Sequence, residues 1–426
     1  MSKYDKAGLV QIPSGYSAGT LYSVVPTSSD GDFDHTRASS ATRVNKDGLI
    51  ETVSSNVPRL DYPLIEGVVS GCPSLLLENS ATNILSYSED FSQSYWNKSG
   101  VLAPVSGFIS PDGTSNAFKL VEDTGSGVHK IVKPYTGPSG TSTCSIFVKA
   151  DEVTKIGISS TESVSVLSSF DLSNGTLISS SSEDYSITPF PNGWYRISST
   201  DTNGNRKMAV FLLNDSGNYS YTGDGTSGLY IWGAMFEQSS FPTSYIPTSG
   251  SAVTRAAETC NNAGDVNTFN DSEGVLMFEV STLVSAGSNR IISLTDGTSA
   301  NKLEINFDTV TDRITVVFTA NSSNQYISAP NLNEVNFNKI AIKYKTNDFA
   351  LWINGIELSS QLSGNTSLSN SFNKLNFSNQ SGGFNFYGNT KQLQYFDTAL
   401  TDTDLEELTS WTSFNEMATG QLYTIE

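Results

Sequence analysis

The 426-residue sequence predicts an all-β protein made of antiparallel β-sandwiches. Short apolar runs with strand-like alternation recur along most of the chain, as in "STCSIFVKA" and "GLYIWGAMFE", and turn clusters such as "DLSNGT" separate them. Charged residues make up only 16% of the sequence, and Ser, Thr, Asn and Gly take their place. That mixture is typical of short strands joined by tight turns, because Gly and Asn tolerate positive φ and Thr suits a pleated surface.

Residues 1–82 are expected to form a small β-rich module. Within it, "TRVNKDGLIETV" predicts a hairpin whose turn runs from Asn45 to Gly48. The segment "CPSLLLE", from Cys72 to Glu78, predicts a buried strand.

Residues 83–250 predict a first complete sandwich, because many short strands follow one another at regular spacing. This pattern is typical of an antiparallel sandwich of jelly-roll type. The stretch from Phe241 to Asp265 reads as extended, and residues 251–269 are expected to form a connector. Strands return over residues 270–426, for example in "RITVVFT" and "KIAIKYK", and predict a second sandwich.

One helix is expected near the end of the chain, in "ALTDTDLEELTSW". Thr401 is placed to cap it, and Asp404 three residues later completes a pair that resembles a capping box. Leu405, Leu408 and Trp411 are spaced to form its apolar face.

The net charge of −19 argues against a nucleic-acid partner, since phosphate binding needs clustered Lys and Arg. The three cysteines, Cys72, Cys144 and Cys260, are far apart and odd in number. They fit neither a disulfide framework nor a CxxC zinc pattern, so reduced and mostly buried thiols are expected.

The N-terminal sequence "MSKYDKAGLVQIPSGYSAG" lacks the apolar core of a signal peptide, and no run is long enough to span a bilayer. We therefore expect that the protein does not insert into a membrane. We also expect that it is assembled in the cytoplasm of the producing cell.

Two acidic stretches are candidates for a metal. In "SDGDFDHT", an EF-hand loop starting at Asp30 would need Gly at its sixth position and Glu at its twelfth, but His35 and Ala41 stand there. A turn stabilised by Asp30, Asp32 and Asp34 is the favoured interpretation. Asp224 in "TGDGTSG" could contribute to a structural calcium site, although a hairpin turn explains the segment more simply.

No catalytic, cofactor-binding or metal-binding residue is assigned, and we expect the protein not to be an enzyme. His35 and His129 have no nucleophile motif nearby, and no nucleophile elbow is present. A glycosidase needs only two carboxylates. Glu279, Glu304 and Asp308 lie on predicted strands, where solvent-facing positions are the favoured interpretation.

Aromatic side chains are candidate platforms for sugar rings. The tryptophans considered are Trp96, Trp194, Trp232 and Trp352. Trp194 and Trp232 lie in apolar strand runs, which favours core packing. Tyr219 and Tyr221 lie in the turn-rich stretch "GNYSYTGDG" and are expected to be more exposed.

Four sub-motifs within Phe33–Leu85 resemble the N-terminal module of tailed-phage fibre and spike proteins: "TRASSATRVNKDGLIE", "NVPRLDY", "GCPSLLLE" and "SATNIL". The following region is similar to carbohydrate-binding-module-like jelly rolls, through "YSEDFSQSYWNKSG", "NGWYRISST" and "LYIWGAMFEQSSFPTSYIP". The last region is similar to concanavalin A-like or laminin-G-like sandwiches, through "FALWINGIEL" and "ALTDTDLEEL".

The resemblance implies that residues 1–82 serve attachment or assembly. In this acidic chain, Arg37, Arg43 and Arg59 are then expected to form ion pairs with Asp or Glu, either within the module or between subunits. Local capping of turns is an equally good interpretation. Arg255 in "SAVTRAAE" echoes "TRASSATR" and is a candidate for a matching role at the second boundary.

The resemblance also implies a structural virion protein on a tail fibre, head fibre, spike or capsid decoration. Its expected partners are other virion proteins, further copies of this chain, for which trimers are common, and a host-surface glycan. A polysaccharide-depolymerising tailspike is the alternative, although no repeat of fixed period is present. A bacterial adhesin is a third reading, which the missing signal peptide and anchor disfavour.

Overall fold

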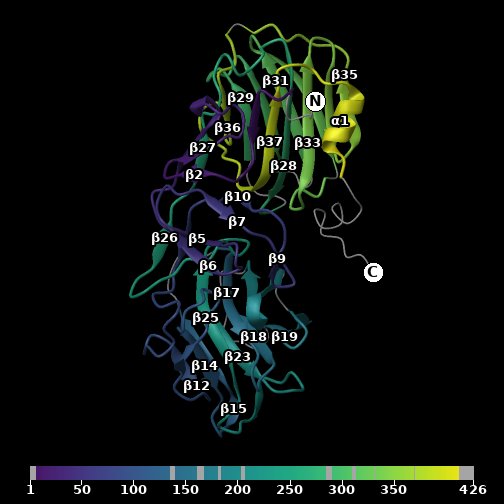
Figure 1. The fold of residues 1–426 in the computed structure, drawn as a ribbon. Helices are drawn as coiled ribbons and strands as arrows, with labels where there is room; N and C mark the ends of the chain where they lie inside the picture. Colours follow the sequence, from purple (N-terminus) through teal and green to yellow (C-terminus); the bar gives the residue numbers. More distant parts are fainter. Residues whose placement is uncertain are drawn as a thin grey trace.

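The structure is a computed structural model that describes residues 6–134, 140–160, 167–180, 184–202, 207–284, 290–308, 313–330, 332–368 and 370–411. Figure 1 shows an elongated body in which two β-sandwiches lie end to end, with helix α1 (Asp402–Thr409) on the outside of one of them. The all-β fold class is confirmed. In the described part of the chain, no helix has the length and hydrophobicity that crossing a bilayer requires.

The first sandwich consists of two six-stranded sheets with antiparallel pairing. One sheet has the order β12-β16-β23-β18-β19-β20 and the other has the order β13-β14-β25-β17-β22-β21. The strands are β12 (Asn97–Ser99), β13 (Val105–Phe108), β14 (Ala117–Val121), β16 (Lys130–Pro134), β17 (Ser142–Lys149), β18 (Lys155–Ser159), β19 (Ser168–Asp171), β20 (Thr176–Ser179), β21 (Asp184–Phe190), β22 (Trp194–Asp201), β23 (Lys207–Leu213) and β25 (Gly228–Glu237).

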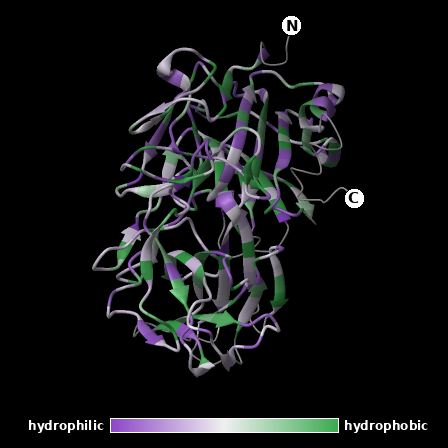
Figure 2. Cartoon of the chain, turned by 60° about the horizontal axis from the view of Figure 1, so that its bottom comes forward, coloured by the Kyte–Doolittle hydropathy of each residue, from purple (hydrophilic) through white to green (hydrophobic). Residues whose placement is uncertain are grey.

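Alternation along β17 explains why this sandwich has two buried faces. Cys144, Ile146 and Val148 point into the core between the sheets. Phe147 points to the opposite face, where other parts of the chain cover it. Figure 2 shows hydrophobic segments on the strands of both sandwiches, as this packing requires.

The second sandwich combines strands from both ends of the chain. Its larger sheet has the order β35-β34-β33-β28-β37-β10-β7, with β1 also paired to β37, and its smaller sheet has the order β32-β31-β30-β29-β36. The strands are β1 (Leu9–Gln11), β7 (Arg59–Asp61), β10 (Ser74–Leu77), β28 (Glu273–Thr282), β29 (Arg290–Thr295), β30 (Lys302–Phe307), β31 (Arg313–Ala320), β32 (Ser323–Pro330), β33 (Asn338–Lys345), β34 (Phe349–Ile353), β35 (Ile356–Gln361), β36 (Lys374–Asn376) and β37 (Gly388–Phe396).

Residues 1–82 contact both sandwiches. Besides β1, β7 and β10, this segment supplies β4 (Phe33–Thr36), which pairs with β27 (Thr259–Asn261), and β11 (Ala81–Asn83), which pairs with β26 (Val253–Arg255). Its hairpin, β5 (Ala41–Val44) and β6 (Ile50–Val53), covers the outer face of the first sandwich, where Ile50 joins the cluster of Phe147 and Trp232. The division of the chain at residues 82, 250 and 269 stays a prediction.

The remaining strands are short two- and three-residue pieces, and two 3-10 turns complete the described elements. The strands are β2 (Tyr16–Ser17), β3 (Thr20–Leu21), β8 (Leu64–Ile65), β9 (Val68–Val69), β15 (Ser126–Val128) and β24 (Ser220–Thr222), and the turns are η2 (Ser29–Gly31) and η4 (Pro191–Gly193).

Several local predictions are confirmed. The hairpin turns at Asn45–Gly48, where Gly48 has a φ of 79° and donates its N–H to the Asn45 carbonyl at 2.9 Å. The segment predicted as a buried strand forms β10, which is buried along its whole length. Cys144 and Cys260 are buried free thiols, whereas Cys72 is exposed.

The predicted helix is confirmed with one correction. The Thr401 side chain accepts the N–H of Asp404, and Leu405 is buried against the larger sheet of the second sandwich. Trp411 does not belong to the helical face, because the helix ends at Thr409. Its ring instead lies 4.6 Å from the Lys339 ammonium.

Candidate functional site

A cluster of buried charges lies where residues 1–82 meet the segment around residue 258. It comprises Arg37 after β4, Arg59 on β7, Glu78 after β10, Arg255 on β26, and Glu258. All five side chains are at most 4% exposed. Four segments of the chain, one of which carries both Arg255 and Glu258, therefore bring their charges to one point.

Glu258 and Glu78 share the guanidinium of Arg59. Arg59 donates Nε–H to Glu258 Oε1 at 2.9 Å and Nη1–H to Glu78 Oε2 at 2.7 Å, and its Nη2 also binds Glu258 Oε2. Arg37 Nη1 lies 2.7 Å from Glu258 Oε1, and Arg255 Nη1 lies 3.0 Å from Glu78 Oε2. Ser244 adds its N–H and its hydroxyl to Glu78, at 2.9 and 2.6 Å.

These contacts keep the cluster ionised. Burial alone would raise the pKa of Glu78, but Arg255 and Arg59 outweigh burial and hold its pKa at about 2. The pKa of Glu258 is likewise lowered, since Arg59, His35 and Arg37 overcome the effect of burial. Carboxylates already bound by so many donors are suited to joining segments and not to proton transfer.

The predicted ion pairs within the module are confirmed for Arg43 and Arg59, but Arg37 pairs with Glu258, which lies outside residues 1–82 of the same chain. Arg37, Arg59 and Arg255 belong to the buried cluster, whereas Arg43 pairs with Glu51 across the β5–β6 hairpin, with Nε and Oε2 2.9 Å apart. The alternative interpretation also applies, because Arg37 donates to the backbone carbonyls of Ser39, Ser54 and Val57.

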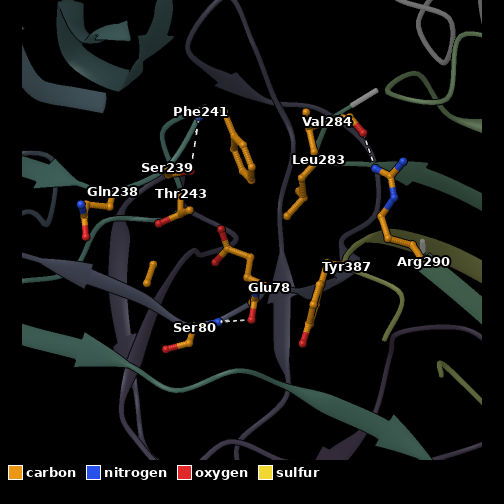
Figure 3. Close-up of a pocket in the computed structure, with 12 residues that line it drawn as sticks. Glu78, Ser80, Gln238, Ser239, Phe241, Thr243, Leu283, Val284, Arg290 and Tyr387 are labelled. Atoms are coloured by element: carbon orange, nitrogen blue, oxygen red, sulfur yellow. Dashed lines mark hydrogen bonds between the residues drawn. The ribbon is translucent and has the colours of Figure 1, made fainter. Parts of the chain in front are cut away.

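A cavity of about 180 Å³ lies next to this cluster, between the two sandwiches. Figure 3 shows Glu78 pointing into it, with Phe241 from the first sandwich facing Leu283 and Tyr387 from the second. Arg290 also lines it, and its Nη2 lies 3.0 Å from Glu334 Oε1. The charged groups of this cavity, Glu78 and Arg290, are thus held by partners within the chain.

A wider groove of about 450 Å³ lies on the first sandwich, and polar side chains dominate its lining. The residues that define this groove, called the acceptor groove below, are Tyr87, Glu89, Asp90, Gln93, Asn116 and Thr248. Glu89 connects the groove to the interior, because the buried Tyr245 hydroxyl donates to its Oε1 at 2.8 Å. Burial raises the pKa of Glu89, although the bond from Tyr245 opposes that effect.

Asn116 is the partner of Glu89 inside the groove. Its Nδ2 donates to Glu89 Oε2 at 3.2 Å, while its Oδ1 is buried and has no hydrogen-bond partner. Asp90 is oriented by Ser92 and by Gln93, whose Nε2 donates to Asp90 Oδ2 at 2.7 Å. The ring of Tyr87 lies 5.5 Å from that of Tyr95, edge to face, and is half-buried. The groove thus presents oxygen acceptors beside the Tyr87 ring, and the buried Phe118 also lines it.

The candidate tryptophan platforms are buried, which confirms core packing. The exposed fractions are 2% for Trp96 and Trp194, 1% for Trp232 and 7% for Trp352. Tyr219 is 38% exposed, as expected of a turn residue. Tyr221 instead packs on the His129 ring and donates its hydroxyl to Glu122 Oε2 at 2.6 Å.

In the first acidic stretch, Asp30 lies in the 3-10 turn η2, but Asp34 and His35 lie on strand β4, so the predicted turn is wrong for Asp34. Asp32 accepts from Ser23, Asp34 accepts from Asn262, and His35 is turned inward, with Nε2 3.7 Å from Glu258 Oε1. The carboxylate of Asp224 accepts the N–H and hydroxyl groups of Thr226 and Ser227, and these bonds, led by the Ser227 hydroxyl, lower its pKa. In the described chain, no group of three or more His, Cys, Asp or Glu side chains is arranged to hold a metal.

The candidate glycosidase acids do not converge. Glu279 on β28 binds Gln392, Glu304 on β30 pairs with Lys302, and Asp308 pairs with Arg313. Since Phe278 and Leu303 point into the shared core, the alternation of the strands places Glu279 and Glu304 on opposite outer faces of the second sandwich. The solvent-facing interpretation was wrong for Glu279 and Glu304, which are only 6% and 5% exposed because neighbouring side chains cover them.

The sequence analysis did not identify the acceptor groove. Four of its residues lie in "YSEDFSQSYWNKSG", whereas Asn116 and Thr248 lie elsewhere in the sequence. A signal was present, since this stretch mixes carboxylate, amide and tyrosine side chains. Asn116 and Thr248 could not be joined to it without the fold.

Comparison with known proteins leaves the family open. No family model matches the chain, and no curated protein matches it. Among solved structures, the chain is similar to the CBM40 of the Ruminococcus gnavus IT-sialidase bound to α2,3-sialyllactose, with 14% identity and a TM-score of 0.29 over 33% of this chain and 83% of that one. A leech intramolecular trans-sialidase gives 17% identity and a TM-score of 0.29 over 34% of this chain and 24% of that one. An SAP-like pentraxin from Limulus polyphemus has 14% identity and a TM-score of 0.28 over 33% of this chain and 71% of that one.

Proposed function

We propose that this chain is a non-enzymatic structural protein of a tailed-bacteriophage virion, where it displays two β-sandwiches and holds a host-surface glycan. The observation that carries the glycan part is the acceptor groove, in which Glu89, Asp90 and Asn116 offer oxygen acceptors beside the Tyr87 ring. Sugar hydroxyls are hydrogen-bond donors, and the apolar face of a sugar ring suits an aromatic wall.

The virion part is supported by the N-terminal resemblance and by the way this segment is built in. Strands β1, β7 and β10 lie in the second sandwich, and the β5–β6 hairpin lies on the first. A segment that packs on both sandwiches in this way would fix the position of each sandwich relative to itself. We propose that it attaches the protein to other virion proteins.

The non-enzymatic assignment rests on how the acids are used. The buried carboxylates Glu78 and Glu258 are saturated by donors, and the strand carboxylates Glu279 and Glu304 lie on opposite faces. We propose further that the protein acts as a homo-oligomer, since several weak glycan contacts held together bind far more tightly than one.

Mass spectrometry of purified phage particles, with electron microscopy of particles labelled by an antibody against this chain, tests the virion assignment. We expect the chain among the particle proteins and the label on the particle surface. Absence of the chain from particles made by a producing host would refute the assignment.

A reducing-sugar assay on host capsular polysaccharide tests the non-enzymatic assignment. We expect no release of reducing ends by the purified full-length protein. Steady release, with a boiled sample as the blank, would instead identify a depolymerase.

A further inference from the structure

We infer that the acceptor groove is a binding site for an uncharged, hydroxyl-rich sugar and that it discriminates against acidic sugars. This inference rests on the glycan part of the proposed function and is independent of the virion assignment. It specifies both the place of binding and the chemical class of the ligand.

The charge of the groove gives the first argument. Glu89 and Asp90 both line it, and no Lys, Arg or His side chain is among its lining residues. Lys98, whose charge acts on Asp90, directs its ammonium to the backbone carbonyls of Ser92, Gln93 and Trp96. A sugar carboxylate in the groove would therefore face two carboxylates with no cation among the lining residues to bind it, and like charges at close range repel.

Hydrogen-bonding capacity gives the second argument. The buried Oδ1 of Asn116 lacks a donor, and an unsatisfied buried acceptor costs free energy. A ligand hydroxyl that donates to this oxygen would remove that cost. Ser106, Ser115 and Ser249 also line the groove and add hydroxyl groups that both donate and accept.

The way these groups are held gives the third argument. Glu89 is fixed by Tyr245 and Asn116, and Asp90 is fixed by Ser92 and Gln93. These hydrogen bonds are already formed in the free protein. Few side chains therefore need to become ordered when a ligand binds. Pre-organisation of this kind raises affinity by lowering the entropic cost of binding.

The test is a binding titration of the full-length protein with a panel of methyl glycosides, followed by NMR. The neutral arm contains methyl glucoside, galactoside, mannoside and N-acetylglucosaminide, and the acidic arm contains methyl glucuronide and the methyl glycoside of N-acetylneuraminic acid. We expect at least one neutral member to bind at millimolar concentration and no acidic member to bind. Binding of an acidic member as tight as that of the best neutral one, or no binding of any neutral member, would overturn the inference.

Two variants place the binding in the groove. Tyr87→Ala is expected to weaken the neutral ligand about tenfold, through loss of the aromatic wall. Tyr219→Ala removes a half-exposed tyrosine of the same sandwich outside the groove and should leave affinity unchanged. Equal effects of the two variants would place binding elsewhere and refute the groove.

A charge variant tests the discrimination itself. In Glu89→Gln combined with Asp90→Asn, we expect methyl glucuronide to bind, because the two repelling carboxylates are gone. Continued rejection of glucuronide by a variant that still binds the neutral sugar would contradict the electrostatic argument. Loss of wild-type binding in EDTA would show that a cation bridges sugar and groove, and it would also overturn direct recognition.

The outcomes separate this inference from the virion assignment. A chain that is absent from particles but binds neutral glycosides leaves the groove intact. A chain that is present in particles but binds no neutral glycoside refutes the groove alone.

Discussion

Glu258 is the carboxylate on which the buried charges converge. It accepts hydrogen bonds from the side chains of Arg37 and Arg59. It also accepts the backbone N–H of Glu78, at 2.9 Å. Removing one partner of a buried ion pair leaves an uncompensated charge, which costs more than the loss of the pair itself. This residue is therefore a sensitive point in the structure.

Glu258→Gln should lower the free energy of unfolding by about 3–5 kcal/mol, as expected for breaking a buried ion pair. Glu51→Gln is the matched control, because Glu51 also pairs with an arginine but its side chain is 42% exposed. Exposed pairs contribute about 0–1 kcal/mol, so the control should change stability little. Urea denaturation of both variants measures the difference, and equal losses would contradict the cluster's role.

Glu237 should make stability depend on pH. Burial raises its pKa to about 7 against a reference of 4.5, although Thr243 donates to both of its oxygens. A raised pKa means that the neutral form is favoured in the folded state, so stability falls as pH rises from about 4.5 to about 7. One pKa unit corresponds to about 1.36 kcal/mol, so the free energy of unfolding should fall by about 3 kcal/mol across this pH window.

Glu237→Gln should flatten this dependence, since glutamine stays neutral across the window. Urea denaturation at several pH values between 4.5 and 7 compares the two proteins. The same downward slope in both would show that another group is responsible.

At the residue scale, sequence reasoning identified the arginines but not their partners. Arg37 and Arg59 stood out as basic residues in an acidic chain, and ion pairs followed from their chemistry. Their common partner, Glu258, is 221 and 199 positions away, and with 43 acidic residues present no local pattern could single it out. The burial of Trp194 and Trp232 was predictable, because both lie within apolar strand runs.

At the element scale, β10, like β1, joins residues 1–82 to the second sandwich by pairing with β37. Leu75 on β10 pairs with Thr390 of β37 on one side and with Leu60 of β7 on the other. Its side chain is fully buried in the core of that sandwich. A change at Leu75 should therefore act far along the sequence.

Leu75→Ala should cost about 2–5 kcal/mol, as expected for a large-to-small change in a core. Hydrogen exchange should become faster in β37 and β28 of the second sandwich, while β17 of the first is less affected. Leu102→Ala is the control, because Leu102 is 44% exposed and its removal should leave exchange unchanged. Faster exchange confined to residues 6–82 would show that this segment is an independent unit.

Individual elements were predictable where their signals are local. The β5–β6 hairpin has its Asn and Gly turn, and α1 has its Thr401 cap. The end of α1 was placed too late, since Trp411 continued the apolar spacing although the helix stops at Thr409. Sheet order was not predictable, because alternation locates a strand without naming its neighbours.

At the scale of the whole molecule, the sandwiches share a seam and are joined by two segments, residues 1–82 and the segment that carries β26. Residues 1–82 contribute strands to the second sandwich and a hairpin to the first, and β26 pairs with β11 beside the charge cluster. Two bodies tied in this way should not unfold independently.

Calorimetry of the full-length protein should therefore give a single transition, with the van't Hoff enthalpy close to the calorimetric enthalpy. Two resolved transitions, or a van't Hoff enthalpy near half the calorimetric value, would mean that the sandwiches unfold separately.

The pairing of β10 with β37 also affects how the protein is made. Ser74 and Asn389, hydrogen-bonded across these strands at 3.0 Å, are 315 positions apart. A ribosome that adds about 5–20 residues per second needs about 15–60 s to supply the second residue after the first. During that interval β10 emerges from the exit tunnel with its future neighbour not yet synthesised. The larger sheet of the second sandwich is therefore completed only after the residues of β37 have been synthesised.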